Sequence, residues 1–130
     1  MTTAPNPHKG RTGFDRIAHA AGYSLQGLRA AWHTESAFRQ EALLAAVMLP
    51  ATCWVAASWA QAVALAGSVV LVLIVELLNS AIEATVDRIS LEHHPLAKYA
   101  KDLGSAAVML ALLLCAGIWL SAIYLRWFAR

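Results

Sequence analysis

The sequence predicts an all-α integral membrane protein, and three observations support this. Of its 130 residues, 59% are hydrophobic and only 14% are charged, whereas soluble domains carry about 25% charged residues. Long apolar runs follow one another, each near the ~20 residues that a helix needs to cross a bilayer. Most Lys and Arg residues lie before or between these runs. We therefore expect one domain over residues 12–130, a helix bundle with an N-terminal surface helix and three transmembrane helices.

The N-terminal part is expected to form a tail and then a surface helix. Residues 1–11 contain prolines and few apolar groups, which is typical of a disordered tail, and no signal peptide is expected there. Residues 12–40 repeat apolar side chains every three or four positions, with basic and aromatic residues among them. A break is expected at Gly22–Ser24, with Ser24 capping the second part. Such a helix is typical of a membrane interface; packing on a soluble core is the alternative interpretation.

Three spanning helices are expected to follow the surface helix. The first covers about residues 41–60 and contains Pro50, which a membrane helix tolerates where its neighbours satisfy the freed carbonyl. The second covers about residues 62–86, and the third about residues 103–128. A polar loop over residues 87–102 joins these two.

The distribution of basic residues predicts which side of the membrane the polar segments face. Five of the ten Lys and Arg residues precede the first span: Lys9, Arg11, Arg16, Arg29 and Arg39. Three more lie in or beside the loop: Arg88, Lys98 and Lys101. With three crossings these two regions share a side, which then carries eight basic residues against two at the C-terminal end. The positive-inside rule places the N-terminus and the loop in the cytoplasm.

The second span carries a polar stripe on an otherwise apolar helix. At ~100° per residue, four polar residues fall within roughly 80° of one another: Glu76, Asn79, Glu83 and Asp87. A charge near the bilayer centre costs about 3 kcal/mol on insertion scales, so an ionisable residue there is a functional candidate. Glu76 is the deepest carboxylate, and desolvation makes it a better base than a surface carboxylate. Asp87 is expected to end the helix and to pair locally near Arg88.

Phosphoryl transfer is one chemistry that these residues fit. Carboxylate oxygens near the membrane surface suit Mg²⁺, which takes one or two protein carboxylates together with waters and substrate phosphates. Cationic side chains on the same side can neutralise phosphate oxygens: Arg16, Arg29, Arg39 and Lys101. A deep base with a metal and cations nearer the surface indicates transfer to a hydroxyl presented from the membrane. Since the sequence has no GxxxxGK[ST] loop and no protein-kinase glycine-rich loop, helix faces and the loop would form any nucleotide site.

Two other interpretations of the stripe stay open on the pattern alone. Intramembrane Glu and Asn residues can hold helices together, at about 0.6 kcal/mol per interaction. A small proton-coupled transporter could use Glu76 as its titrating group. The net charge of +2 gives no reason to expect nucleic acid as a partner.

Several short stretches combine into a specific motif pattern. They are Ala20-Ala21-Gly22-Tyr23-Ser24, Gly27-Leu28-Arg29-Ala30-Ala31-Trp32, Glu35, Ala37-Phe38-Arg39-Gln40-Glu41, Val75-Glu76-Leu77-Leu78-Asn79-Ser80-Ala81-Ile82-Glu83, Asp87-Arg88-Ile89 and Ala100-Lys101-Asp102-Leu103-Gly104-Ser105-Ala106-Ala107-Val108. Together they resemble the small integral-membrane diacylglycerol kinases of Gram-negative bacteria. The Glu-x-x-Asn-Ser-Ala-x-Glu block combined with Ala-Lys-Asp-x-Gly-Ser-Ala-Ala carries most of the specificity. The resemblance covers about residues 12–128.

The resemblance implies a fold and an activity. It implies a homotrimer of three-span subunits in the bacterial inner membrane, with active sites shared between neighbouring subunits at the cytoplasmic face. The family transfers the γ-phosphate of MgATP to the 3-hydroxyl of diacylglycerol, giving phosphatidic acid in phospholipid recycling. Mg²⁺ is therefore the expected cofactor, and ATP, diacylglycerol and the bilayer are the expected partners. A related branch phosphorylates undecaprenol, but residues 23–32 and 37–41 favour the diacylglycerol branch by resemblance.

The resemblance also implies roles for individual residues. Glu76 corresponds to the general base, supported by Asn79 and Lys101, and Glu35 and Glu83 correspond to the metal ligands. The implied nucleotide contacts are Arg16, Tyr23, Glu35, Glu83, Glu92, His94, Lys101 and Asp102. The implied lipid and phosphate region is lined by Arg16, Ser24, Arg29, Trp32, Arg39, Glu76 and Ser105. Two positions depart from the family pattern: His93 stands where an aromatic residue is usual, and Lys98 where a small one is usual.

Overall fold

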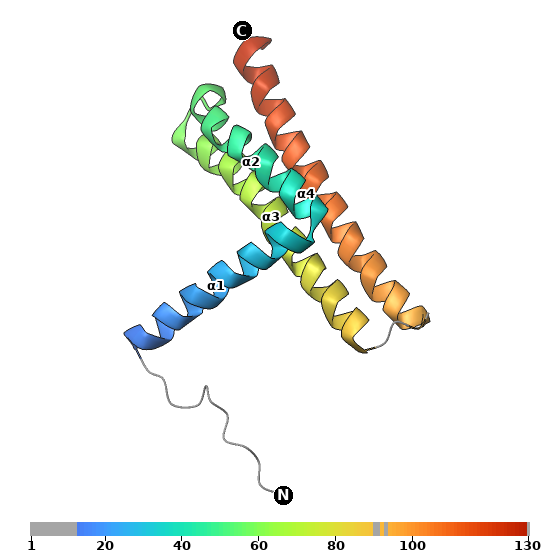
Figure 1. Ribbon diagram of the computed structural model, residues 1–130. Coiled ribbons are helices and arrows are strands. Elements are labelled where there is room, and N and C mark those ends of the chain that lie inside the picture. Colours follow the sequence, from blue (N-terminus) through green and yellow to red (C-terminus); the bar gives the residue numbers. More distant parts are fainter. Residues whose placement is uncertain (1–12, 90–91, 93, 130) are drawn as a thin grey trace, which may run out of the picture.

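The computed structural model describes residues 13–89, 92 and 94–129. Helices occupy nearly all of the described chain: α1 (Phe14–Thr34), α2 (Ser36–Val55), α3 (Trp59–Ile89) and α4 (Pro95–Trp127). The predicted all-helical architecture is therefore confirmed (Figure 1). The expected tail over residues 1–11 lies outside the described residues.

Helices α2, α3 and α4 form a bundle from which α1 projects (Figure 1). The largest interface is between α3 and α4, which lie side by side, and α2 packs on one half of α3. Helix α1 contacts chiefly α2, through the elbow that joins them, and leaves the bundle near the middle of α3. The end of α3 and the start of α4 continue past that point as a two-helix extension. The fold therefore places the elbow between α1 and α2 beside the polar half of α3.

The lengths and exposure of α3 and α4 fit a membrane. Their 31 and 33 residues correspond to about 46 and 50 Å of helix, against a hydrocarbon layer of about 30 Å. Their most apolar windows have a mean hydropathy of 2.3 and 2.4, and only 28% and 22% of these windows is buried. Apolar side chains that face outward along such helices are typical of lipid contact. The chain fits a helical membrane protein, and both α3 and α4 are longer than the apolar layer is thick.

Helix α2 differs from the two long helices. It has 20 residues, includes Arg39 and Glu41 in its first turns, and continues through Pro50. Among the described helices, only α3 and α4 are both long and apolar enough to count as candidate spans. The first span, expected over residues 41–60, therefore stays a prediction, and the helix that covers most of it begins at Ser36 and ends at Val55.

The expected break at Gly22–Ser24 is wrong. Helix α1 continues through both residues, and the Ser24 hydroxyl donates to the Ala20 carbonyl oxygen at 3.0 Å instead of capping a new helix. Glycine lowers helix stability by only about 1 kcal/mol, and serine can bond back to the preceding turn. The actual break is at Glu35, whose backbone is extended with φ −103° and ψ 112°.

The polar connection is much shorter than the expected loop over residues 87–102. Helix α3 continues to Ile89, and α4 begins at Pro95 after the N-cap residue His94. The His94 Nδ1 atom accepts a hydrogen bond from the backbone N–H of Leu96 at 3.2 Å, and proline is favourable in the first turn of a helix. The residues expected in the loop at 98, 101 and 102 therefore lie on the first turns of α4. His93 lies outside the described residues.

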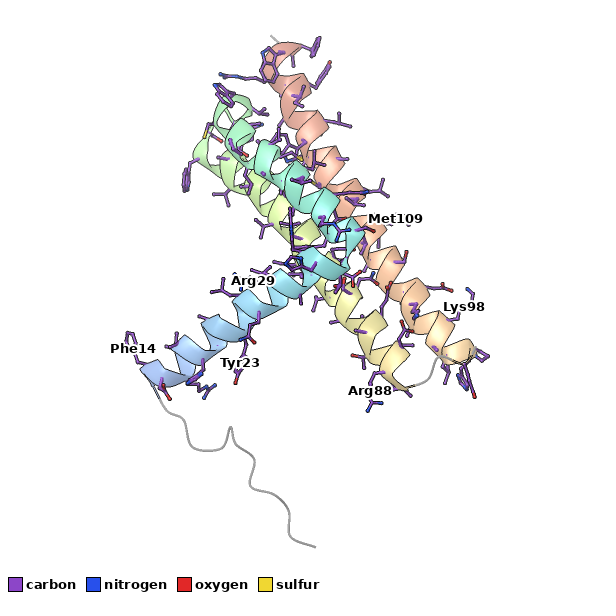
Figure 2. All side chains as sticks on the ribbon, viewed as in Figure 1. Phe14, Tyr23, Arg29, Arg88, Lys98 and Met109 are labelled. Atoms are coloured by element: carbon purple, nitrogen blue, oxygen red, sulfur yellow. The ribbon has the colours of Figure 1, made fainter. Side chains whose placement is uncertain are left out.

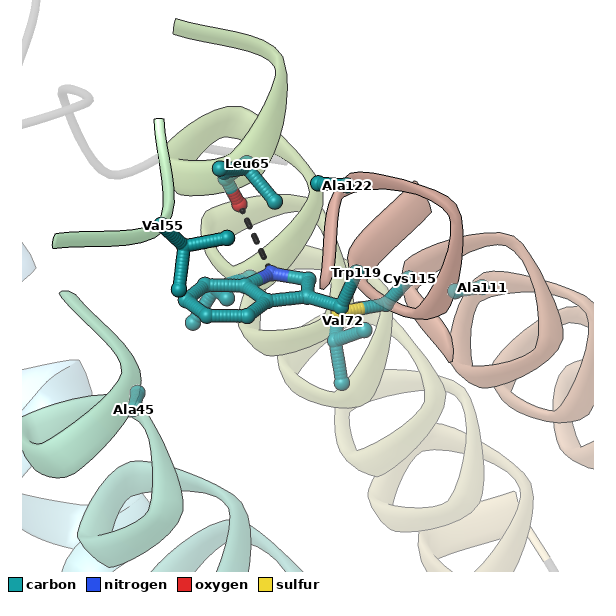
Figure 3. Close-up of a cluster of buried hydrophobic side chains, with 9 residues drawn as sticks. Ala45, Val55, Leu65, Val72, Ala111, Cys115, Trp119 and Ala122 are labelled. Carbon is teal, nitrogen blue, oxygen red and sulfur yellow. Dashed lines mark hydrogen bonds between the residues drawn. The ribbon is translucent and has the colours of Figure 1, made fainter. Parts of the chain in front are cut away.

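An apolar core fixes the register of α3 and α4 at the end remote from the polar connection (Figure 3). The indole N–H of Trp119 donates to the backbone carbonyl oxygen of Leu65 at 3.2 Å. The Ser68 hydroxyl also donates to the Leu65 carbonyl, at 2.8 Å, and lies 3.5 Å from the Cys115 sulfur. Each buried polar group in this layer therefore has a partner, and the layer holds two helices that otherwise expose much apolar surface.

Candidate active site

Four carboxylates from three segments gather where α1 leaves the bundle. Glu76 of α3 is only 5% exposed, and it is the only charged residue that is buried among those the structure describes. Glu35 at the elbow and Glu83, two turns further along α3, are both within electrostatic range of Glu76. Glu41 of α2 is also within this range. The predicted base and both predicted metal ligands therefore lie in one region.

Asn79 links the polar stripe to α4. Its amide Nδ2 donates to the Oε1 atom of Glu83 at 3.1 Å, one helical turn away. Its Oδ1 atom is buried and has no hydrogen-bond partner among the described residues. This oxygen faces Gly104 of α4, where an added methyl group would overlap with it. The amide is therefore held between a carboxylate on its own helix and the backbone of the next.

Arg39 fixes the elbow that carries Glu35. Its Nη1 atom donates to the backbone carbonyl oxygens of Trp32 at 3.0 Å and His33 at 3.2 Å. These carbonyls belong to the last turn of α1, where helical partners are missing and a cation is favourable. Thr34 donates its hydroxyl to the Glu35 Oε1 atom at 3.3 Å. Arg39, which the resemblance places in the lipid and phosphate region, thus caps α1 in this structure.

Two ion pairs lie near the connection between α3 and α4. Lys101 Nζ contacts Asp87 Oδ1 at 2.6 Å across the two helices, and the hydrogen bond to Asp87 raises the pKa of Lys101. Lys98 Nζ contacts Asp102 Oδ2 at 2.5 Å, one turn along α4. The expectation that Asp87 ends the helix and pairs near Arg88 is wrong, because α3 continues to Ile89 and Asp87 pairs with Lys101. Lys101 and Asp102, the two predicted nucleotide contacts on α4, are therefore each paired with a residue of opposite charge.

The other predicted nucleotide and lipid contacts divide between two distant parts of the chain. Tyr23 and Arg29 project from α1, whereas Arg88 and Lys98 lie at the far end of the α3–α4 pair (Figure 2). Five predicted contacts lie on α1: Arg16, Tyr23, Ser24, Arg29 and Trp32. Four lie at the connection or on α4: Glu92, His94, Lys101 and Asp102. Ser105 is exposed on α4 beside the buried Gly104. A single chain does not bring the α1 set and the α4 set together.

The carboxylates fit magnesium in donor type. Glu35 and Glu83 are both oxygen donors near Glu76, and Mg²⁺ needs only one or two protein carboxylates when waters and phosphates complete its octahedron. Across the part of the chain that the structure describes, no cluster of three or more His, Cys, Asp and Glu side chains is arranged to hold a metal. The donors therefore suit a metal that arrives with phosphate groups better than one bound in an all-protein cage.

Comparison with known proteins places these residues in a family. The profile described as prokaryotic diacylglycerol kinase matches residues 22–123. The chain belongs to this family. A diacylglycerol kinase of Pseudomonas aeruginosa is 52% identical over 116 residues, which cover 89% of this chain and 94% of the relative. That of Escherichia coli is 53% identical over 108 residues, covering 83% and 88%, and that of Haemophilus influenzae is 43% identical over 108 residues, covering 83% and 92%.

The family assignment confirms the resemblance that the motifs indicated. The matched segment contains every predicted site residue except Arg16. Membership of a kinase family favours an enzyme over a proton-coupled transporter or a purely structural pair of helices. The cluster around Glu76 is therefore the candidate active site of a kinase.

Two residues at this site received no role from the sequence. Glu41 was only part of a motif, yet its buried Oε2 atom has no hydrogen-bond partner among the described residues, and its carboxylate is within electrostatic range of Glu76. Gly104 was part of a motif, but the motif did not show that Asn79 lies against it. A glycine within a polar motif at the start of an apolar helix is the available signal, since glycine permits close approach between helices.

Proposed function

We propose that the chain is an ATP-dependent diacylglycerol kinase of the bacterial inner membrane. It transfers the γ-phosphate of MgATP to the 3-hydroxyl of diacylglycerol, giving phosphatidic acid. The observation that carries this proposal is the buried Glu76, surrounded by carboxylates where the apolar part of α3 ends. Relatives more than 50% identical over most of the chain bear the name diacylglycerol kinase, which supports the choice of substrate.

Glu76 serves as the general base. Glu76 is buried where the apolar run of α3 gives way to the polar stripe, and a lipid whose acyl chains lie along the apolar part of α3 would present its hydroxyl there. As the hydroxyl oxygen bonds to the γ-phosphorus, the bond from that phosphorus to the β-γ bridging oxygen breaks and ADP leaves. The hydroxyl proton passes to Glu76. Protein side chains mainly position the reactants and stabilise charge in such transfers, and a positioned base contributes about 10²–10⁴-fold.

Glu35 and Glu83 would hold Mg²⁺ with the nucleotide phosphates. When bound, the ion neutralises phosphate charge during transfer. The Asn79 amide donates to one oxygen of Glu83 and so restricts that carboxylate. The backbone bonds of Arg39 fix the angle of the elbow and thereby the position of Glu35. Each proposed ligand is therefore oriented by a neighbouring residue.

The nucleotide and lipid sites would be completed by a second subunit. Helix α1 carries one set of proposed contacts and projects away from the α3–α4 pair that carries the other. A homotrimer of three-span subunits, with its N-terminus and polar connection in the cytoplasm, would bring α1 of one chain to the extension of another. The exposed apolar surface of α3 and α4 supports such an assembly, since large apolar patches mark membrane or subunit contacts.

Transfer of radiolabelled phosphate from ATP tests the proposal. Purified protein in mixed micelles is offered diacylglycerol, with undecaprenol in a parallel reaction. Diacylglycerol should be labelled, and Glu76→Gln should lower kcat by at least about 100-fold with the oligomer intact on gel filtration. Asp15→Asn is the matched control, since Asp15 is an exposed carboxylate on α1.

Other outcomes would contradict the proposal. Near-normal kcat in Glu76→Gln would remove Glu76 as the base. Preferential labelling of undecaprenol would change the substrate. Substrate-dependent proton flux into sealed vesicles without ATP consumption would indicate a transporter instead.

A further inference from the structure

We propose that Gly104 is a positioning residue that sets the Asn79 amide and, through it, the Glu83 carboxylate. The effect on Mg²⁺ binding by Glu83 rests on the proposed function, but the contact between Gly104 and Asn79 does not. Gly104 is buried in the third turn of α4, directly against Asn79 of α3. It is thus the place where the backbone of one helix touches the polar stripe of the other.

Gly104 differs from the other glycines that the structure describes. At Gly13, Gly22, Gly27, Gly67 and Gly117, an added methyl group would have no neighbouring atom within 4 Å. At Gly104 it would overlap with the Asn79 side-chain oxygen and come within 3.3 Å of the Asn79 Cγ atom. The missing side chain therefore matters at this position for a reason that does not apply at the others.

The absence of a side chain at Gly104 decides where the Asn79 amide lies. Asn79 Oδ1 points at the α4 backbone and has no hydrogen-bond partner among the described residues, while Nδ2 donates to Glu83. The reverse orientation would bring Oδ1 against the Glu83 carboxylate, which is unfavourable because both groups are acceptors. The amide is thus kept with its donor toward Glu83.

A methyl group at position 104 would be relieved most easily by Asn79. The overlapping atom is the far end of a short side chain, whereas α4 itself is packed along α3. Rotation of Asn79 would leave the two helices in place and break the bond from Nδ2 to Glu83. We therefore expect Gly104→Ala to fold and assemble, but with a Glu83 carboxylate that is no longer held.

A double-mutant cycle on thermal unfolding tests the contact without any turnover. Wild type, Gly104→Ala, Asn79→Ala and the double variant are compared in detergent micelles. Gly104→Ala should lower the unfolding midpoint by about 4 °C in the Asn79 background. With Asn79→Ala it should leave the midpoint unchanged or raise it, because alanine favours a helix over glycine once the overlap is gone. Equal shifts in both backgrounds would overturn the proposal.

Gly117→Ala is the matched control, since it makes the same change in the same helix where no atom lies within 4 Å. It should raise the midpoint slightly or leave it unchanged in both backgrounds. A fall like that of Gly104→Ala would mean that any alanine on α4 disturbs the fold, which would also overturn the proposal. If Gly104→Ala fails to fold, recovery of folding in the double variant supports the contact, and failure of both counts against it.

The Mg²⁺ dependence tests the positioning of Glu83. Gly104→Ala should need about tenfold more Mg²⁺ for half-maximal activity, a loss that corresponds to one weakened ligand, with kcat at saturating Mg²⁺ within about threefold of Gly117→Ala. The rise in unfolding midpoint caused by Mg²⁺ with a non-hydrolysable ATP analogue should need correspondingly more Mg²⁺. A merely structural role would reduce the amount of folded protein without changing the Mg²⁺ dependence of activity or of the unfolding midpoint, and that result would overturn the positioning role.

If wild type has no kinase activity, the proposed function fails, and the unfolding measurements still decide this inference.

Discussion

The two ends of the α3–α4 pair are built differently. At the end shown in Figure 3, the polar groups of Trp119 and Ser68 both donate to the Leu65 carbonyl, and apolar side chains surround them. On the side toward the polar connection, Asn79 Oδ1 of α3 and Glu41 Oε2 of the neighbouring α2 are buried without hydrogen-bond partners among the described residues. Unsatisfied buried polar groups are rare and destabilising, and they concentrate where a ligand or a reaction needs them. The first part holds the fold together, and the second carries the proposed active site.

Neutralising a proposed metal ligand should give the largest effect, and only on activity. Glu83→Gln and Glu35→Gln each remove a carboxylate beside Glu76, so either should lower activity by about 100-fold or sharply raise the Mg²⁺ requirement. Stability should not fall, because reducing the number of neighbouring acidic groups relieves repulsion. Activity assays across a Mg²⁺ titration, with unfolding midpoints measured in parallel, check this. An unchanged Mg²⁺ dependence would remove the metal role.

At the apolar end shown in Figure 3, Trp119→Phe should lower stability and leave activity unchanged. The change keeps an aromatic ring but removes the N–H that donates to Leu65. Stability should fall by about 1 kcal/mol, while kcat per folded protein stays the same. Trp54→Phe is the matched control, because Trp54 is 71% exposed. Loss of kcat without loss of stability in Trp119→Phe would show that the two ends are not separate.

The same contrast separates what the sequence could predict from what it could not. Hydropathy alone located the apolar parts of α3 and α4, and the spacing of polar residues located the stripe on α3, since both depend only on local periodicity. The break at Glu35 was missed because Gly22 and Ser24 carry stronger local signals than a cap donated by Arg39 from the next helix. The contact between Asn79 and Gly104 joins residues on separate helices, so it depends on a helix register that only tertiary packing supplies.

Asp87→Asn should lower thermal stability moderately, because Asp87 forms the ion pair between α3 and α4 near their polar connection. It removes the charge that pairs with Lys101 at 2.6 Å, so the unfolding midpoint should fall by about 2 °C. The hydrogen bond to Asp87 raises the pKa of Lys101 from its ordinary 10.5. The stabilisation that accompanies a raised lysine pKa is fully present when the pH is below the ordinary lysine pKa, and it is lost only when the pH rises above that value. The difference from wild type should therefore stay constant between about pH 7 and 9, and a difference that shrinks over this range would contradict the pairing.

Lys98→Ala should have the smallest effect, although Lys98 forms the second ion pair at the polar end. Its contact with Asp102 at 2.5 Å joins two exposed side chains one turn apart on α4, and such pairs contribute only about 0.3–0.5 kcal/mol. The helix dipole disfavours a cation in the first turn of a helix, and alanine favours helix more than lysine does. The gain from these two effects should nearly cancel the loss of the ion pair, so stability should hardly change.

Removal of Lys98 frees Asp102, a proposed nucleotide contact, and the KM for ATP should fall by no more than about twofold. Lys101→Ala, compared in the same assay, should lower activity strongly. A rise in KM of about tenfold in Lys98→Ala would instead mean that Lys98 binds the phosphates directly, and the reactive end of the molecule would then extend one turn closer to the connection between α3 and α4.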